Sequence, residues 1–283
     1  MTSQSRELKI ALPNKGSLAD SAAHIMKEAG YRQRTDSRDL SFIDPDNGVE
    51  FYYLRPRDIA TYVGSGDLTV GITGRDLLLD SAAEAEEVMG LDFGKSNFRF
   101  AATTSSAKLE GARIATAYPT LLASYLAGKG IAASIVHLDG AVESAIRLGV
   151  ADVIADVVAT GSTLKQAGLG IFGDLILSSE AILIERKGAI RNSKVETLIR
   201  RLNSVVIARQ YVLVDYDVQR SVLDAACALT PGLESPTISP LQKPDWVAVR
   251  AMVKRGDVHS VMDQLWEIGA RGILVTDIHS CRL

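Results

Sequence analysis

The chain has 283 residues, of which 47% are hydrophobic, and 31 Lys and Arg against 34 Asp and Glu give it a formal net charge of -3. At roughly 150 residues per domain, this length suggests about two domains. The ordinary composition excludes disordered, collagen-like and fibrous classes. Because the charge is small and has no blocks, no field over the whole protein favours nucleic acid or an anionic membrane. An anionic ligand must therefore meet local positive groups or a metal.

The two cysteines, Cys227 and Cys281, form no CxxC pair, which argues against a disulfide framework and a structural zinc site. The first residues run into an alternating segment rather than an apolar signal core, and no apolar stretch long enough for a transmembrane helix follows. We therefore predict a cytoplasmic protein.

Strand, turn and helix alternate along the first part of the chain. Apolar residues alternate over residues 8–12, a turn follows at residues 13–16, and a helical pattern extends to Gly30. The same order begins at three later strands, residues 68–72, 113–117 and 150–158. This alternation predicts α/β layers with much parallel sheet, and similar Gly-Asp starts of two units suggest two similar lobes. The turns at the carboxyl ends of their strands would face the cleft between them.

From about residue 205 the order changes to strand, helix, strand, strand, helix, strand. Its predicted segments are residues 205–214, 218–229, 235–239, 246–253, 258–268 and 273–278. This is the split βαβ, ferredoxin-like order, so we expect a third, small α+β domain.

The segment 143–164 is the most informative. An apolar strand carries Asp152 and Asp156 at even spacing, so both point to one face, and it ends in small, hydroxyl-bearing residues before a helix. Backbone N–H groups and hydroxyls of such a loop converge on an anion at the helix N-terminus, with a strength that suits a monophosphate ester. Asp156 is placed to accept hydrogen bonds from ribose hydroxyls. A capped helix start with a solvated aspartate remains the alternative for this segment alone.

Cationic side chains occupy comparable turns elsewhere. Lys15 follows the first strand, Arg55 and Arg57 lie together in one later turn, and Arg75 follows the strand at residues 68–72. Any one of them alone is typical of a solvated surface residue. Several cations at the carboxyl ends of strands, opposite a phosphate loop, form a coherent site for a polyanion.

The segment 143–164 resembles the signature pattern of the ATP phosphoribosyltransferase family at every fixed position. These positions are Glu143, Gly149, Ala151, Ile154, Asp156, Val157, Thr160, Gly161, Thr163 and Leu164. Four further runs are similar to that family, residues 13–16, 71–76, 115–119 and 232–237. The resemblance covers the chain from about Leu8 to Leu283 and indicates the long form, which carries its own regulatory domain.

This resemblance implies condensation of ATP, at adenine N1, with phosphoribosyl pyrophosphate to give phosphoribosyl-ATP and pyrophosphate. That reaction is the first step of histidine biosynthesis, and feedback inhibition by histidine is implied with it. The implied fold is α/β, with two periplasmic-binding-protein-like lobes flanking a cleft and a C-terminal α+β ferredoxin-like (ACT-like) regulatory domain. Its expected boundaries are residues 1–98 with 184–208 for lobe I, 99–183 for lobe II and 209–283 for the regulatory domain.

The resemblance also implies the site residues. The expected catalytic residues are Lys15, Arg55 and Asp156. The phosphoribosyl group would contact Asp152, Asp156, Ala159, Thr160, Gly161, Ser162 and Thr163. ATP or the product would contact Lys15, Arg55, Arg75, Asp76 and Tyr118. Allosteric histidine would contact Asp217, Leu233, Ser235, Thr237 and Gly272.

Mg²⁺ is the implied cofactor, carried mainly by the substrate phosphates because it keeps several waters and takes few protein carboxylates. Neither nucleic acid nor a membrane is expected as a partner, and the family suggests a homo-oligomer in which dimers assemble into hexamers. The alternative from another class is a two-lobed solute-binding or sensor protein for an anionic small molecule or amino acid, because such folds also bind ligands without chemistry.

Overall fold

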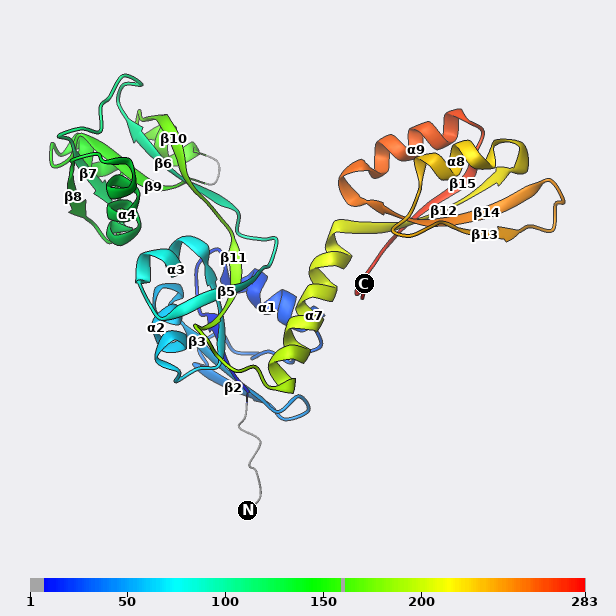
Figure 1. The fold of residues 1–283 in the computed structure, drawn as a ribbon, viewed down its shortest axis with the longest axis horizontal. Helices are drawn as coiled ribbons and strands as arrows, with labels where there is room; N and C mark the ends of the chain where they lie inside the picture. The colour runs from blue at the N-terminus through cyan, green and yellow to red at the C-terminus, as the bar shows by residue number, and fades with distance from the viewer. Residues whose placement is uncertain (1–7, 159–160, 283) are drawn as a thin grey trace, which may run out of the picture. The chain divides into compact units, whose positions relative to one another are not determined.

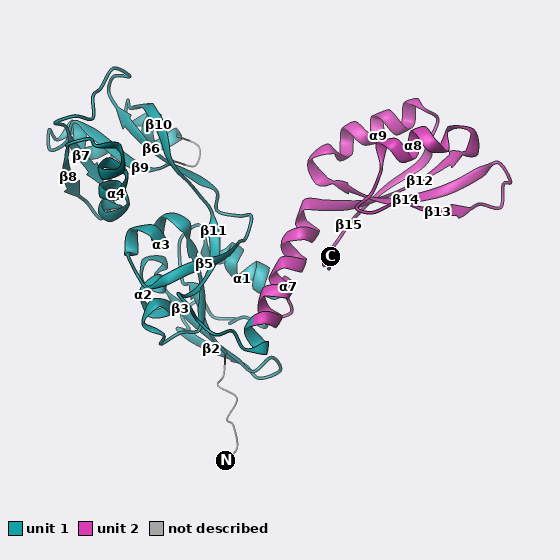
Figure 2. Ribbon diagram, in the orientation of Figure 1, with its two compact units in different colours: residues 1–27, 31–195 teal, residues 28–30, 196–283 magenta. Residues whose placement is uncertain are grey.

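The computed structural model describes residues 8–158 and 161–282, which fall into two compact units (Figures 1 and 2). Unit 1 comprises residues 1–27 and 31–195, and unit 2 comprises residues 28–30 and 196–283. Two sheets lie in unit 1 and a third lies in unit 2. We call the two halves of unit 1 lobe I and lobe II.

Lobe I is built on a six-stranded mixed sheet in the order β2-β3-β1-β4-β11-β5. Its strands are β1 (Leu8–Pro13), β2 (Ser41–Asp44), β3 (Val49–Leu54), β4 (Val70–Gly74), β5 (Ala85–Gly90) and β11 (Ala181–Arg186). β1 pairs in parallel with β3 and β4, whereas β11 runs antiparallel between β4 and β5. A strand from late in unit 1 therefore completes a sheet that the N-terminal residues begin.

Three helices connect the strands of lobe I, α1 (Ala19–Glu28), α2 (Pro56–Ser65) and α3 (Arg75–Ser81). β1 is buried at every position except Lys9, which is partly exposed, as expected for a central strand covered on both faces. α2 packs against β1, β4 and β11, and its Ile59, Ala60 and Val63 are fully buried. This packing fixes the carboxyl ends of the central strands.

Lobe II is built on a five-stranded sheet in the order β10-β6-β9-β7-β8. Its strands are β6 (Ser96–Ala102), β7 (Arg113–Thr116), β8 (Ser134–His137), β9 (Val153–Val158) and β10 (Gly170–Ser179), and its helices are α4 (Pro119–Lys129), α5 (Ser144–Arg147) and α6 (Ser162–Gln166). β7 is parallel to β8 and β9, whereas β6 is antiparallel to β9 and β10. The chain enters this lobe between β5 and β6 and returns between β10 and β11.

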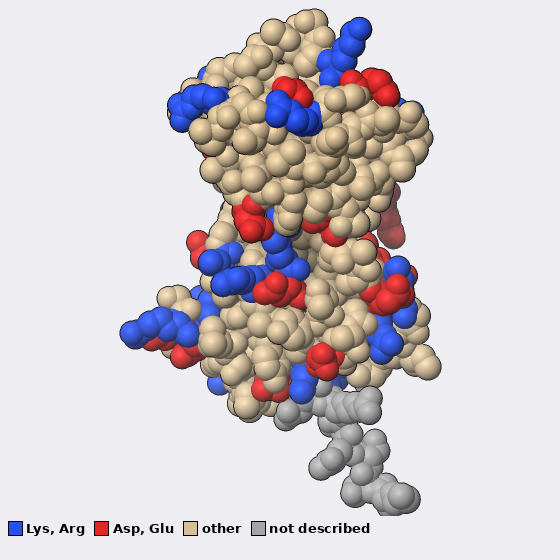
Figure 3. Space-filling model, turned by 90° about the vertical axis from the view of Figure 1, so that its left-hand side faces the viewer, with Lys and Arg blue, Asp and Glu red and all other residues tan. Residues whose placement is uncertain are grey.

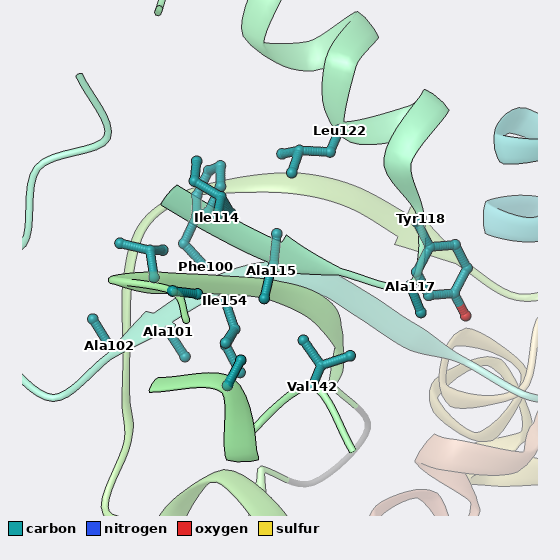
Figure 4. Packing of buried hydrophobic residues seen from close by; sticks show 14 of the residues in the cluster. Phe100, Ala101, Ala102, Ile114, Ala115, Ala117, Tyr118, Leu122, Val142 and Ile154 are labelled. Atoms are coloured by element: carbon teal, nitrogen blue, oxygen red, sulfur yellow. The ribbon is translucent and has the colours of Figure 1, made fainter. Parts of the chain in front are cut away.

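The core of lobe II lies between its sheet and its helices (Figure 4). Phe100, Ile114 and Ile154 come from three strands of the sheet, and Leu122 comes from α4. Tyr118 lies at the edge of this cluster, and its hydroxyl points away from the labelled apolar side chains. The same cluster that stabilises lobe II therefore also holds Tyr118.

The sheet of unit 2 has four strands in the order β13-β14-β12-β15. The elements are α7 (Ser193–Gln210), β12 (Tyr211–Gln219), a 3-10 turn (Arg220–Val222), α8 (Leu223–Leu229), β13 (Thr237–Pro240), β14 (Trp246–Lys254), a 3-10 turn (Arg255–Asp257), α9 (Val258–Glu267) and β15 (Arg271–Asp277). From β12 onward this is the ferredoxin-like order that the sequence predicts. The predicted α/β fold with two lobes and a C-terminal α+β domain is confirmed.

One predicted segment is wrong. The sequence predicts a β-rich segment from residue 205, whereas α7 extends to Gln210 and the strand starts at Tyr211. Leu198, Leu202 and Val205 recur at helical spacing and are buried, so the helical period prevails over the β-propensity of the valines. In residues 8–158 and 161–282, none of the helices combines the length and the apolarity needed to span a bilayer.

Candidate functional site

A pocket of about 370 Å³ lies in unit 1 and is lined by residues of both lobes. The lining residues are Lys15, Gly16, Ser17, Leu18, Pro56, Gly74, Asp76, Leu77, Gly94, Lys95, Ser96, Tyr118 and Val157. Figure 3 shows charged side chains of both signs gathered along the waist between the two lobes, whereas the face of lobe II in view is mainly uncharged. We call the pocket defined by these lining residues the cleft.

The turn between β1 and α1 brings Lys15 to the cleft. The Asn14 N–H donates to the Leu54 carbonyl at 2.8 Å, which holds the turn beside the end of β3. Gly16 has a φ of 84°, a left-handed conformation that favours glycine, and its carbonyl accepts from the Ala19 N–H as the helix begins. Lys15 itself is exposed, so its ammonium is accessible to an anion in the cleft. Arg55, at the end of β3, is also exposed but does not line the cleft.

Asp76 is a buried carboxylate at the start of α3 and lines the cleft. The Ser179 hydroxyl donates to its Oδ1 at 2.7 Å, and the Asp76 N–H donates to the Ser179 Oγ at 3.0 Å. Gly74 makes room for this carboxylate, because a Cβ at that position would overlap Asp76 Oδ1. Ser179 therefore contacts both the side chain and the main chain of Asp76.

Tyr118 forms the lobe II side of the cleft. Its ring is buried and meets Phe98 edge-on at a centroid distance of 5.4 Å, and the Arg57 guanidinium carbon lies 4.6 Å from its centroid. Burial raises the pKa of the Tyr118 hydroxyl strongly, and the negative charge of the neighbouring Asp76 carboxylate raises that pKa further. The Tyr118 hydroxyl of lobe II therefore stays protonated beside the Asp76 carboxylate of lobe I.

Asp156 lies near the end of β9, where its Oδ1 accepts from the Val157 N–H at 2.8 Å. Burial raises the pKa of this carboxyl, and the nearby Glu143 and Asp76 raise it as well, whereas Arg57 lowers it. A partly desolvated carboxylate with a single backbone donor has capacity for further hydrogen bonds from a ligand.

The loop after β9 leads into α6. Gly161 has a φ of 74° and precedes the helix that begins at Ser162, and its carbonyl accepts from the Lys165 N–H at 3.1 Å. Thr163 is exposed in the first turn of this helix. Ala159 and Thr160, which the sequence also assigns to this loop, lie outside the described residues.

Two predicted residues differ from expectation in their surroundings. Asp152 immediately precedes β9, at its amino end, and pairs with Arg113 at 2.8 Å. Even spacing places it on the face of Asp156, but four residues of strand separate the two by about 13 Å. Arg75 pairs with Glu87 at 2.7 Å and Glu180 at 3.1 Å, and it lines a separate polar pocket of about 440 Å³ beside the segments that join the lobes.

The five residues predicted to bind histidine do not converge within one copy of unit 2. Gly272 lies on the edge strand β15, where a Cβ would be 3.5 Å from Asp217 Oδ2. Thr237 lies on β13 at the opposite edge of the sheet, and Leu233 and Ser235 precede it. Three strand spacings, about 14 Å in total, separate the two edges.

Several residues of the site escape sequence reasoning. Ser179, which holds Asp76, comes from the last residue of β10, and Gly94, Lys95 and Ser96 come from the segment entering lobe II. No local pattern marks these residues, because Ser96 and Ser179 are brought together by strand pairing across 83 residues of chain, and Ser179 meets Asp76 only in the folded protein. In residues 8–158 and 161–282, no group of three or more His, Cys, Asp or Glu side chains is arranged to hold a metal ion.

Residues 55–204 match a family model described as ATP phosphoribosyltransferase, and residues 208–280 match one described as HisG, C-terminal domain. The chain is 59% identical to the ATP phosphoribosyltransferase of Pseudarthrobacter chlorophenolicus, over 98% of this chain and 100% of the relative. It is 58% identical to that of Salinispora tropica, over the same shares of the two chains. A solved ATP phosphoribosyl transferase (HisG:HisZ) complex from Thermotoga maritima is similar in fold, with a TM-score of 0.62 and 28% identity over 70% of this chain and 97% of that chain.

Proposed function

The chain belongs to the ATP phosphoribosyltransferase family and is a pentosyl transferase of histidine biosynthesis, and from this premise we propose how its cleft holds the two substrates. Phosphoribosyl pyrophosphate lies with its phosphoribosyl group against lobe II and its pyrophosphate toward lobe I, where ATP also binds. The observation that carries this proposal is the composition of the cleft, in which the Lys15 turn of one lobe faces Tyr118 and the end of β9 in the other.

On the lobe II side, Asp156 accepts hydrogen bonds from the ribose hydroxyls, and the loop of residues 159–163 holds the 5-phosphate. The partly buried position of Asp156 and the left-handed Gly161 before α6 support this assignment. Each charge-assisted hydrogen bond contributes on the order of 1.5–3 kcal/mol, so a few of them suffice for one phosphate ester. Asp152 stays outside this set because it pairs with Arg113 at the other end of the strand.

On the lobe I side, Lys15 and Arg55 bind the pyrophosphate and the triphosphate of ATP, and Asp76 and Tyr118 border the nucleotide. The exposure of both cations and the lining of the cleft by Lys15 support these roles. Arg75 contributes to this region indirectly in our proposal, because Glu87 and Glu180 engage its guanidinium and it holds the segments that join the lobes.

The reaction displaces pyrophosphate from the anomeric carbon by the adenine N1 lone pair, which carries no proton to remove. The protein therefore needs to orient two substrates and neutralise a leaving anion rather than supply a general base. Mg²⁺ fits the residues present, because it takes one or two carboxylates together with substrate phosphates, and Asp76 and Asp156 are the carboxylates at hand. When bound, it would supply positive charge to the departing pyrophosphate.

Pyrophosphate release from ATP, phosphoribosyl pyrophosphate and Mg²⁺ tests the substrate arrangement. We expect Asp156→Ala and Thr163→Ala to lower kcat/KM for phosphoribosyl pyrophosphate by about 10- to 100-fold, as the loss of one charge-assisted hydrogen bond predicts, and to change KM for ATP far less. Asp152→Asn, at the residue that immediately precedes the same strand, serves as the matched control and should leave both constants unchanged. Equal effects of Asp156→Ala on the two substrates would reject this placement.

Residues 209–283 form the regulatory domain in our proposal, and histidine binds near Asp217 and Gly272. Because Thr237 lies at the opposite edge of the sheet, a histidine that contacts all five predicted residues needs edges from two copies of the chain. This supports the expectation of a homo-oligomer under histidine control.

A further inference from the structure

The short helix α3 connects the cleft with the body of lobe II. Asp76 and Leu77 in its first turn line the cleft, and Leu77 packs against the apolar core of lobe II. Asp80 lies in its last turn, on the side of α4. Both ends of a lobe I helix therefore contact lobe II.

Asp80 caps the first turn of α4 from the other lobe. Its Oδ1 accepts from the Thr120 N–H at 2.9 Å and from the Leu121 N–H at 3.1 Å, and its side chain is only 11% exposed. α4 has no cap of its own, because Tyr118 at the N-cap position makes no side-chain cap hydrogen bond and Pro119 follows it. The amides that a helix normally satisfies with its own cap are here satisfied across the lobe boundary.

Arg57 joins the same contact from the first turn of α2. Its Nη1 lies 3.4 Å from Asp80 Oδ2, and its guanidinium lies over the ring of Tyr118. Tyr118 is therefore held on one side by Arg57 and, through the start of α4, by Asp80.

We propose that Asp80 and Arg57 form a latch between the lobes that stabilises the arrangement in which Tyr118 faces Asp76 across the cleft. Both are positioning residues for the transfer reaction, because neither lines the cleft. Arg57 contacts Tyr118 directly, and Asp80 holds the start of α4, which follows Tyr118 in the chain. The latch matters to a substrate that contacts both lobes at once. The inference thus rests on the proposed function, in which phosphoribosyl pyrophosphate bridges lobe I and lobe II.

A latch of this kind has a kinetic signature that separates it from a purely structural role. Without the latch, a smaller fraction of the free protein has Tyr118 facing Asp76 across the cleft. The apparent affinity for the bridging substrate then falls in proportion to that fraction. Saturating substrate restores the arrangement, so kcat is retained. A residue that only supports folding would instead lower kcat with the folded fraction and leave KM unchanged.

The test compares Asp80→Ala, Asp80→Asn and Arg57→Gln in the full chain, with Glu84→Gln as a control for an exposed lobe I carboxylate. We expect Asp80→Ala to raise KM for phosphoribosyl pyrophosphate about tenfold with kcat within about twofold of the parent. Asp80→Asn keeps an oxygen that can accept from both amides but loses the charge facing Arg57, so it and Arg57→Gln should give smaller increases. Glu84→Gln should give none.

Amide hydrogen exchange of the ligand-free protein provides a second measurement, which does not depend on the substrate assignment. Exchange at Thr120 and Leu121 should accelerate in Asp80→Ala and stay near the parent rate in Asp80→Asn. An unchanged KM in Asp80→Ala, or a fall in kcat that matches a loss of folded protein, would overturn the latch even if Asp156→Ala behaves as proposed. Failure of Asp156→Ala to discriminate the substrates would instead reject the substrate placement.

Discussion

Replacement of Gly74 by alanine tests how much the hydrogen bond between Ser179 and the Asp76 carboxylate contributes to the stability of the protein. Gly74 has φ -80° and ψ 145°, which alanine adopts without strain, and a new Cβ there would overlap Asp76 Oδ1 and displace it. That displacement breaks the hydrogen bond from Ser179, which is 2.7 Å long and buried. We expect a loss of about 1.5–3 kcal/mol, the range for a hydrogen bond to a charged group.

For a domain of this size, 1 kcal/mol corresponds to a shift of roughly 2–4 °C in Tm, so Gly74→Ala should lower the Tm of unit 1 by about 3–12 °C. Gly128→Ala is the matched control, because Gly128 lies within α4 and a Cβ there meets no atom within 4 Å. Its Tm should rise slightly, since alanine is the better helix former. Differential scanning calorimetry measures both. An unchanged Tm for Gly74→Ala beside a raised Tm for Gly128→Ala would refute the argument that Asp76 is held in place.

Two further predictions concern Asp156 and Asp217. Burial raises the folded-state pKa of Asp156 above its usual value of 3.8, so the ionised carboxylate lowers stability above that raised pKa, and stability is recovered as the pH falls through it. Asp156→Asn should therefore raise Tm at neutral pH, with the difference vanishing below pH 3.8, and a lower Tm at both pH values would contradict this. Asp217→Asn should raise the histidine concentration for half-inhibition about tenfold, the loss expected for one charged hydrogen bond. Asp215→Asn, whose carboxylate pairs with Arg250, is its control, and equal responses of the two variants would reject the site.

The local patterns of the sequence predict the fold where one segment determines its own structure. The strand at residues 8–12 and the helix after it follow from periodicity, a turn and a glycine stop, and the structure has β1 and α1 there. Local patterns also predict strands at residues 235–239 and 246–253, and in the structure β13 and β14 pair antiparallel there. Pairing is not local, so nothing in residues 181–186 reveals that β11 inserts antiparallel between β4 and β5.

The candidate site also contains residues that the sequence indicates and residues that it does not. The turn after the first strand predicts that Lys15 faces a cleft, and the family resemblance implies Asp76 and Tyr118 as site residues; all three line the cleft. Asp152 illustrates the limit, because even spacing gives the face of a strand but not the pairing of Asp152 with Arg113 just before β9 begins. Asp80 and Ser179 act on groups more than 35 residues away, Thr120 and Asp76, so the sequence around each gives no sign of its partner.

The position of β11 also has a consequence for the order in which the protein forms during synthesis. All five strands of the lobe II sheet lie between Ser96 and Ser179, so this sheet can pair as soon as that contiguous segment has emerged. The lobe I sheet cannot, because β4 and β5 are joined only through β11, which is made afterwards. Until Arg186 has been added, the nascent chain keeps two unpaired strand edges, and contacts this distant in sequence form slowly. We therefore expect lobe II to fold first on the ribosome and lobe I to fold second. The nascent chain is most prone to aggregation in the interval between these two events.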